Sequence, residues 1–131
     1  NPLNIRHSAD QWQGARKEQT DPSFVQFEAM AYGYRAAWKT LESYWKHFHR
    51  TGQYYNVRNI ITRWAPPSEN HTEAYIRRLC NSTGFARDRK LDTLSADDMI
   101  PIVTAISAVE NGIPADPKAV EAGWLEFRKE Y

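Results

Sequence analysis

The sequence predicts a single α+β domain that is mostly helical, with a small N-terminal β-hairpin lobe over residues 1–28 and a helical lobe over residues 29–131. Three observations predict this fold class. The chain has 131 residues, which is the usual size of one domain. Its first part holds a short aromatic and β-branched segment between turn-forming residues. The remainder holds apolar residues at helical spacing, separated by proline, glycine and capping residues.

The N-terminal lobe is predicted from residues 24–28. This segment reads FVQFE and follows the turn sequence Asp21-Pro22-Ser23, an arrangement typical of a short strand. Gly14, which follows Trp12 closely, can supply a turn or a bulge. We therefore expect two or three short strands. Because Asp-Pro also precedes many helices, a helix from Thr20 onward is the competing interpretation.

The clearest helix is predicted over residues 30–50. Its large apolar residues recur three or four positions apart, which places them on one stripe: Tyr34, Trp38, Leu41, Trp45 and Phe48. Such a stripe is expected to face the core, and a platform for sugar rings is the alternative. The sequence Thr51-Gly52 is expected to end the helix.

Start and stop signals divide the rest of the chain into four shorter helices. The first of these is expected over residues 56–64, and the others are expected to begin near Asn70, Ser95 and Asp116. The helix at Asn70 carries the pattern of a capping box, in which Glu73 reaches back to the helix start. Pro101 falls in the second turn of the helix at Ser95 and is expected to bend or delay it.

Charge is distributed unevenly along the chain, although the formal net charge is only +1. Residues 50–90 hold eight Lys or Arg against three Asp or Glu, and residues 91–131 hold three against eight. A basic middle segment can meet an anionic partner, and a dipolar surface facing solvent is the alternative. We expect no nucleic acid among the partners. The most apolar stretch, residues 100–109, is far shorter than the roughly 20 residues of a membrane span.

No metal and no cofactor are expected. The chain has one cysteine, Cys80, so an intramolecular disulfide and a cysteine-rich zinc site are excluded. Its four histidines lack the spacing of metal ligands. Neither of the common glycine-rich phosphate-binding motifs occurs in the sequence.

The carboxylates are the remaining candidates for chemistry. Cleavage of a glycosidic bond needs a protonated acid beside the bond, and apolar surroundings keep a carboxyl group protonated. Glu28 has apolar neighbours in the sequence, and an exposed glutamate at a strand end is its alternative. Glu69 precedes a helix, where simple helix-start electrostatics would also explain it. Glu110 is a weaker candidate, because a negative charge in the last turn of a helix is unfavourable. Arg35 and Arg63 could anchor a carboxylate or a sugar hydroxyl, or form surface ion pairs.

Several motifs resemble those of small phage and prophage proteins with structural or lytic roles. The motifs are NPLNIR at residues 1–6, WQG at 12–14, FVQF at 24–27 with YGYRA at 32–36, IITRWAPPSENHTEAY at 60–75, and ENG at 110–112. The resemblance covers nearly the whole chain, and the stretch WAPPSENHT is its most specific part. The family includes the lytic protein carried inside enveloped double-stranded RNA phages. Through that protein it is linked to the lysozyme-like, lytic-transglycosylase-like fold.

The resemblance implies a lysozyme-like domain over residues 1–131 that degrades peptidoglycan, with a non-catalytic virion or wall-binding module as the alternative. The implied partners are peptidoglycan and other virion proteins. The implied location is the virion, or the bacterial cytoplasm before release, with action in the periplasm or cell wall. In the similar autolysin glucosaminidases the catalytic glutamate lies upstream of the turn that matches residues 1–6. The resemblance therefore leaves three alternatives: the acid lies in a segment before Asn1, another carboxylate serves, or the fold is kept without catalysis. Leu3 also stands where the family has glycine.

Candidate site residues follow from the carboxylates and from the matched motifs together. The expected catalytic residues are Glu28 and Glu69. The expected substrate-binding residues are Arg35, Arg63, Trp64, Asn70, Thr72 and Tyr75. Together they predict a groove between the N-terminal lobe and the helix that follows the two prolines at 66–67.

Overall fold

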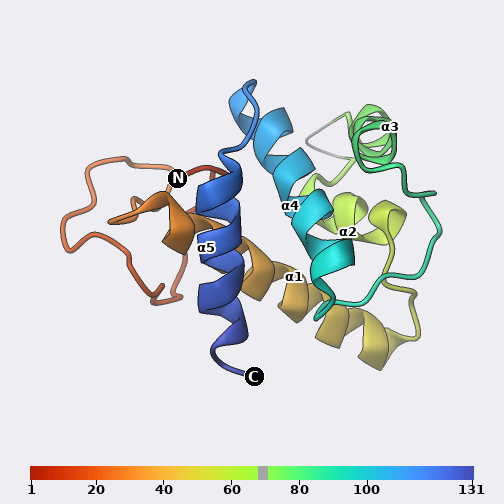
Figure 1. The fold of residues 1–131 in the computed structure, drawn as a ribbon, viewed down its shortest axis with the longest axis horizontal. Coiled ribbons are helices and arrows are strands. Elements are labelled where there is room, and N and C mark those ends of the chain that lie inside the picture. Colours follow the sequence, from red (N-terminus) through yellow and green to blue (C-terminus); the bar gives the residue numbers. More distant parts are fainter. Residues whose placement is uncertain (68–70) are drawn as a thin grey trace.

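The computed structural model describes residues 1–67 and 71–131, and the regular secondary structure in these residues is all helical. The helices are α1 (Met30–Thr51), α2 (Val57–Trp64), α3 (Thr72–Thr83), α4 (Ala96–Asn111) and α5 (Pro117–Arg128). The long α1 packs against α5, α4 contacts both α5 and α3, and α2 packs against α3 (Figure 1). The fold is therefore all-α.

The predicted β-lobe over residues 1–28, and with it the α+β fold class, is wrong. This segment is irregular, and within it the chain pairs with itself only at isolated positions, Arg6 with Phe24 and Ala15 with Phe27. The alternative of a helix from Thr20 onward is also wrong, because α1 begins at Met30.

Backbone pairing in the N-terminal segment is limited to a few bonds, such as that from Val25 to the carbonyl of Ile5, and side chains make further local hydrogen bonds. The side-chain carbonyl of Gln26 accepts from the backbone N–H groups of Thr20 and Asp21. The side-chain amide of Asn1 donates to the carbonyl of Val25 at 2.7 Å. Local bonds of this kind compete with regular secondary structure. Val25 is nevertheless buried, so the apolar pattern of the segment marks burial without marking a strand.

Helix starts and ends in the remainder of the chain match the expected signals. The side chains of Asn56, Ser95 and Asp116 each accept a hydrogen bond from a backbone N–H in the first turn of α2, α4 and α5 respectively. Pro101 lies inside α4 without ending it. The caps confirm the predicted positions of these helices.

The start of α3 differs from the predicted capping box. The helix begins at Thr72, and the carboxylate of Glu73 forms an ion pair with Arg87 at 2.6 Å. The proposed partner in the capping box, Asn70, lies outside the described residues. An ion pair to the loop after α3 therefore replaces the expected bond from Glu73 to the helix start.

The predicted stripe on α1 faces the core, except for Trp45, which is 37% exposed. Trp38 is completely buried and lies edge-on to Trp124 of α5, with ring centres 5.2 Å apart. Its indole N–H donates to the carbonyl of Met99 in α4 at 3.0 Å. One aromatic side chain thus joins three helices, which is the role expected of a core stripe.

The first residues of the chain dock against the end of α4. Leu3 is fully buried, and the carbonyl of Pro2 accepts a hydrogen bond from the side-chain amide of Asn111. The backbone of Asn4 is left-handed, with φ of 53°, and its side chain donates to the carbonyl of Glu110 at 3.5 Å. The left-handed residue of this turn is therefore Asn4, which tolerates that conformation, rather than Leu3. Docking therefore places residues 2–4 against the C-terminal end of α4.

None of the helices in the described ranges combines the length and the low charge needed to cross a bilayer.

Candidate functional site

Three adjoining hollows follow α1 and form what we call the α1 groove. The middle hollow, the central pocket, has a volume of about 280 Å³. It shares Thr40 with a hollow lined by Trp12 and Arg35, and it shares Tyr44 with a hollow lined by Arg63. An elongated groove of this kind suits an extended ligand.

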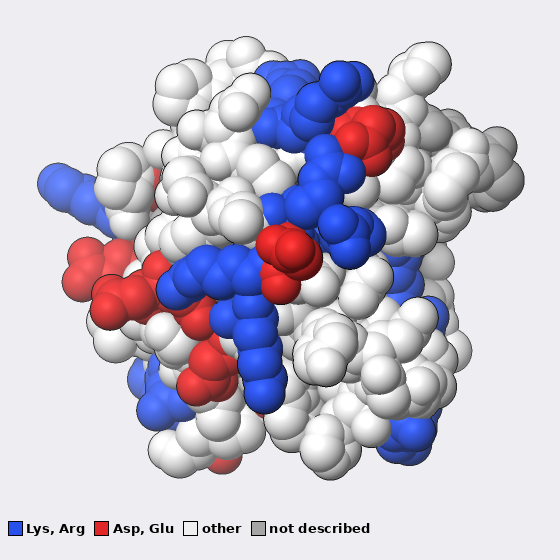
Figure 2. All heavy atoms as spheres, turned by 90° about the vertical axis from the view of Figure 1, so that its right-hand side faces the viewer, with Lys and Arg blue, Asp and Glu red and all other residues white. Residues whose placement is uncertain are grey.

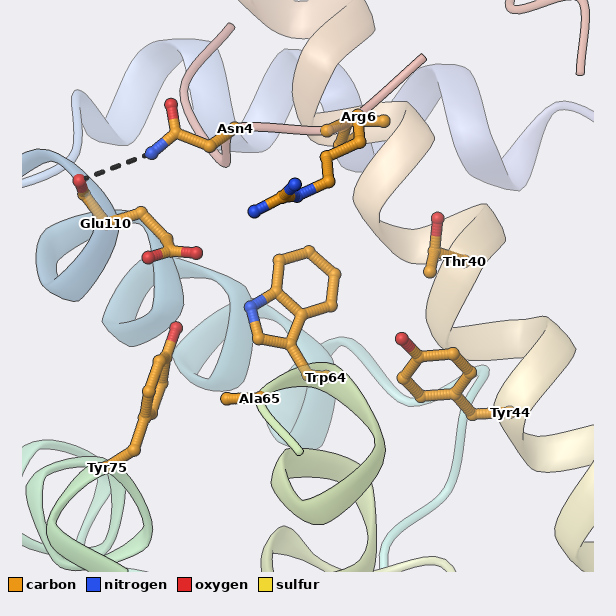
Figure 3. A pocket seen from close by; sticks show the side chains of 9 residues that line it. Asn4, Arg6, Thr40, Tyr44, Trp64, Ala65, Tyr75 and Glu110 are labelled. Carbon is orange, nitrogen blue, oxygen red and sulfur yellow. Dashed lines mark hydrogen bonds between the residues drawn. The ribbon is translucent and has the colours of Figure 1, made fainter. Parts of the chain in front are cut away.

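Five parts of the chain converge on the central pocket (Figure 3). They are the N-terminal segment (Asn4, Ile5 and Arg6), α1 (Thr40 and Tyr44), the end of α2 (Trp64 and Ala65), α3 (Tyr75) and the end of α4 (Glu110). The pocket therefore combines three aromatic rings with several hydrogen-bonding groups and one carboxyl group.

Glu110 extends from the last turn of α4 toward Trp64 and Tyr75 (Figure 3). Burial raises the pKa of its carboxyl group, and the indole N–H of Trp64 and the guanidinium of Arg6 oppose this rise without cancelling it. The carbonyl end of a helix also disfavours a negative charge. The carboxyl group therefore keeps its proton to a higher pH than an exposed glutamate does.

The hydroxyl of Tyr75 points toward Glu110 from α3 (Figure 3). Burial and the nearby negative charge of Glu110 raise the pKa of the phenol, so the hydroxyl stays protonated at neutral pH. The nearby Trp64 N–H opposes this rise without cancelling it, and the buried hydroxyl itself donates no hydrogen bond within the described part of the chain. It is a donor without a protein acceptor, directed into the pocket.

Buried polar atoms without a partner concentrate in the α1 groove. Among the described residues these atoms are Trp12 Nε1, Arg35 Nε and Tyr75 Oη. All three side chains line the groove. A buried donor left without a partner costs about 1–3 kcal/mol, so such groups usually mark a place where a ligand or water completes the hydrogen bonding.

Four of the predicted site residues lie along the α1 groove, namely Arg35, Arg63, Trp64 and Tyr75. The guanidinium of Arg35 is also ion-paired with Glu130, which fixes it in place. The guanidinium of Arg63 lies 5.3 Å from the ring centre of Tyr44. The structure thus brings together residues that are up to 40 positions apart in the sequence, from Arg35 to Tyr75.

Other predicted residues lie elsewhere. Glu28 is exposed just before α1, and its backbone N–H donates to the carbonyl of Gly14 at 2.7 Å. The hydroxyl of Thr72 donates to the carbonyl of Ala65, and Thr72 is buried beside a different hollow. Glu69 and Asn70 lie outside the described residues. Glu28 therefore takes no part in the groove.

The sequence prediction did not include Asn4, Arg6, Thr40 and Tyr44 in the site. Asn4 and Arg6 belong to a matched motif, but nothing in the sequence shows that this motif meets the end of α4. Glu110 gave a usable signal, since its charge is unfavourable for a helix end. The unfavourable position of the Glu110 carboxylate at the end of a helix was therefore a local indication that this residue belongs to a site.

Another hollow, outside the α1 groove, lies among basic residues. Lys and Arg side chains gather in a band over the face that carries α3 and the loop after it (Figure 2). Arg58, Arg77 and Arg87 line this hollow together with Glu73, whose ion pair with Arg87 neutralises part of the charge. In the part of the chain that the structure describes, no three His, Cys, Asp or Glu residues cluster closely enough to bind a metal.

Comparison with known proteins relates the chain to a phage protein. No model of a protein family matches the sequence. Over 116 residues the chain is 36% identical to Protein P5 of Pseudoalteromonas phage PM2, an alignment that covers 86% of this chain and 68% of the phage protein. Identity of this extent is a sign of common ancestry. This chain therefore belongs to the family of Protein P5 of Pseudoalteromonas phage PM2.

Proposed function

We propose that this chain is part of a phage virion protein that binds glycan strands of the bacterial cell wall in the α1 groove. The sequence similarity to a phage protein supports the assignment of this chain to a phage. The observation that carries the ligand assignment is the lining of the central pocket, which combines three aromatic rings with hydrogen-bonding side chains. A ligand with many hydroxyl groups would also give the buried, unpartnered polar atoms along the groove their partners.

The central pocket has the composition that a sugar ring requires. Sugars present apolar C–H faces and a rim of hydroxyl groups that both donate and accept hydrogen bonds. The rings of Tyr44, Trp64 and Tyr75 offer apolar surface with polar edges, and Asn4 and Thr40 offer hydrogen-bonding groups. The flanking hollows extend this surface in both directions along α1. Such an arrangement suits a polymer of sugars better than a single small molecule.

Binding to purified sacculi tests this function. The wild-type chain is expected to sediment with sacculi, and Trp64→Ala is expected to weaken binding at least about tenfold, because one good packing contact is worth about 1.5 kcal/mol or more. Trp45→Ala is the matched control, since Trp45 is also a partly exposed tryptophan but does not line the α1 groove. If both variants sediment with sacculi to the same extent as the wild type, the assignment of the groove as the binding site is contradicted.

Analysis of purified phage particles tests the virion setting. The chain is expected to copurify with infectious particles through a density gradient and to be detected in them by mass spectrometry. Recovery only in the unassembled fraction of infected cells would contradict a virion role. This result would leave the glycan-binding groove to be judged by the sedimentation experiment alone.

A further inference from the structure

Among the described residues that line the central pocket, Glu110 carries the one carboxyl group. We propose that Glu110 donates the proton in cleavage of a glycosidic bond held in the central pocket, an inference that rests on the proposed function. The chain would then cut the glycan strand that it binds.

The surroundings of Glu110 suit a group that must be protonated before it reacts. Burial raises its pKa, and the charged or titratable groups that face it come from separate elements. Arg6 comes from the N-terminal segment and Tyr75 from α3, while Tyr44 of α1 lines the same pocket beyond Trp64. Burial also raises the pKa of both tyrosines, so Arg6 is the charged neighbour at neutral pH. A glutamic acid placed against an indole ring in a partly buried pocket is a recurring way to hold a proton for donation.

The same neighbouring residues also stabilise Glu110 after it has given up its proton. Once the proton has left, Glu110 is a carboxylate, and the Trp64 N–H and the Arg6 guanidinium both favour that charged form. The free hydroxyl of Tyr75 is directed toward the same space (Figure 3). The pocket therefore favours the protonated form of Glu110 relative to an exposed glutamate and still offers donors to the anion once it forms.

The proton and electron balance of the step is complete without a cofactor. Glu110 gives its proton to the bridging oxygen as the bond between that oxygen and the anomeric carbon breaks, and the oxygen keeps the electron pair and becomes a hydroxyl group. The positive charge left on the sugar ring is then quenched when a hydroxyl oxygen, of water or of the sugar itself, bonds to the anomeric carbon. The Glu110 carboxylate takes the proton from that hydroxyl and returns to its starting state.

Parallel binding and cleavage assays on sacculi test this inference. The wild type, Glu110→Gln and the matched control Glu121→Gln would each be scored for sedimentation and for soluble glycan fragments separated by chromatography. Glu121 is an exposed residue of α5 and undergoes the same chemical change outside the groove. We expect Glu110→Gln to release fragments at least about 100-fold more slowly per bound molecule than the wild type, since a general acid typically contributes 10²–10⁴-fold. Glu121→Gln is expected to match the wild type in both.

The outcomes separate the two proposals. Wild type that binds sacculi without releasing fragments, or Glu110→Gln that releases them at the wild-type rate, would overturn the role of Glu110 and leave the binding function intact. Wild type that neither binds nor releases would overturn both.

The pH dependence of cleavage gives a readout that a structural role of Glu110 would not move. The wild-type rate is expected to fall as pH rises through the raised pKa of Glu110, because the carboxylate has no proton to give. Arg6→Gln removes a cation that lowers this pKa, so the fall is expected at higher pH in this variant. A fall at the same pH in both proteins would contradict the assignment.

Discussion

Tyr75 carries a hydroxyl group that the fold itself does not need. Its buried Oη makes no hydrogen bond among the described residues, so Tyr75→Phe removes no internal bond. We expect thermal stability to be unchanged or raised by up to about 1 kcal/mol, and sacculus binding to weaken about three- to tenfold, because one hydrogen bond is worth about 0.5–1.5 kcal/mol. Thermal melting and sedimentation measure the two effects.

Tyr55→Phe is the control for that prediction. The hydroxyl of Tyr55 donates to the carbonyl of Leu41 at 3.1 Å and is deeply buried. Its removal leaves a buried acceptor short of a donor, so we expect a loss of about 1–3 kcal/mol in the free energy of unfolding without a specific loss of binding. The opposite ranking of the two variants in stability would contradict the view that Tyr75 is reserved for a ligand.

Glu110 makes the stability of the chain depend on pH in a defined direction. Its pKa is raised in the folded state, so the folded state binds the proton more tightly, and stability falls as pH rises from the unfolded pKa through the folded pKa. Glutamine does not titrate, so the Glu110→Gln variant is not destabilised in this way as the pH rises. We expect the variant to be more stable than the wild type by about 0.3–1 kcal/mol at pH 8, the value of a charge at a helix end, and to match it near pH 4. Thermal melts at the two pH values check this, and a gain at pH 4 alone would contradict it.

Pocket residues that share one compact motif could be grouped from the sequence, whereas pocket residues from distant segments could not. Trp64 and Tyr75 lie in one matched stretch and share one pocket wall. Asn4 and Glu110 are 106 residues apart, and only the docked N-terminal segment brings them together. Glu28 has apolar neighbours in the sequence but is exposed in the structure, where Ala29 and Met30 beside it are exposed as well.

At the scale of elements, the crossing of α1 and α5 depends on Gly123. A Cβ atom at this position would lie 2.6 Å from Cβ of Tyr34 and 2.7 Å from the carbonyl oxygen of Ala31. Because these neighbours are a backbone carbonyl and the Cβ atom of a buried tyrosine, they cannot move aside without disturbing the helix packing. We expect Gly123→Ala to lower the free energy of unfolding by about 1–3 kcal/mol in denaturant titration. Ala122→Ser, at an exposed position next to it, should change stability by less than about 0.5 kcal/mol.

The helices were predictable because each carries its own local signal. The α1 stripe and the caps at Asn56, Ser95 and Asp116 act over a few residues, and the structure uses them as expected. The N-terminal segment was not predictable in this way. Its apolar residues are buried, as in a strand, but its backbone pairing is limited to a few bonds, and side chains such as Gln26 make further local hydrogen bonds. Burial of apolar side chains and backbone pairing between strands are separate properties, and the pattern of apolar residues in the sequence indicates only the burial.

At the scale of the whole molecule, the docked N-terminal segment should respond to Asn111. The Asn111 side chain donates to the carbonyl of Pro2 and, at 3.1 Å, to the carbonyl of Ser107. Asn111→Ala removes both bonds, so we expect faster hydrogen exchange at the backbone N–H of Val25, which bonds to the carbonyl of Ile5. The α1–α5 contact should keep its protection. Uniformly faster exchange across all helices would contradict local release of the segment.

The meeting of Asn4 with the end of α4 has a consequence for how the protein comes into being. On the ribosome the N-terminal residues emerge first, and their binding place is absent until α4 has followed them out of the exit tunnel. A contact across 106 residues also forms late when a chain refolds, because closing so long a loop costs entropy that only later packing repays. The proposed glycan site should thus be among the last features to mature, and a nascent or half-refolded chain should be inert toward the wall.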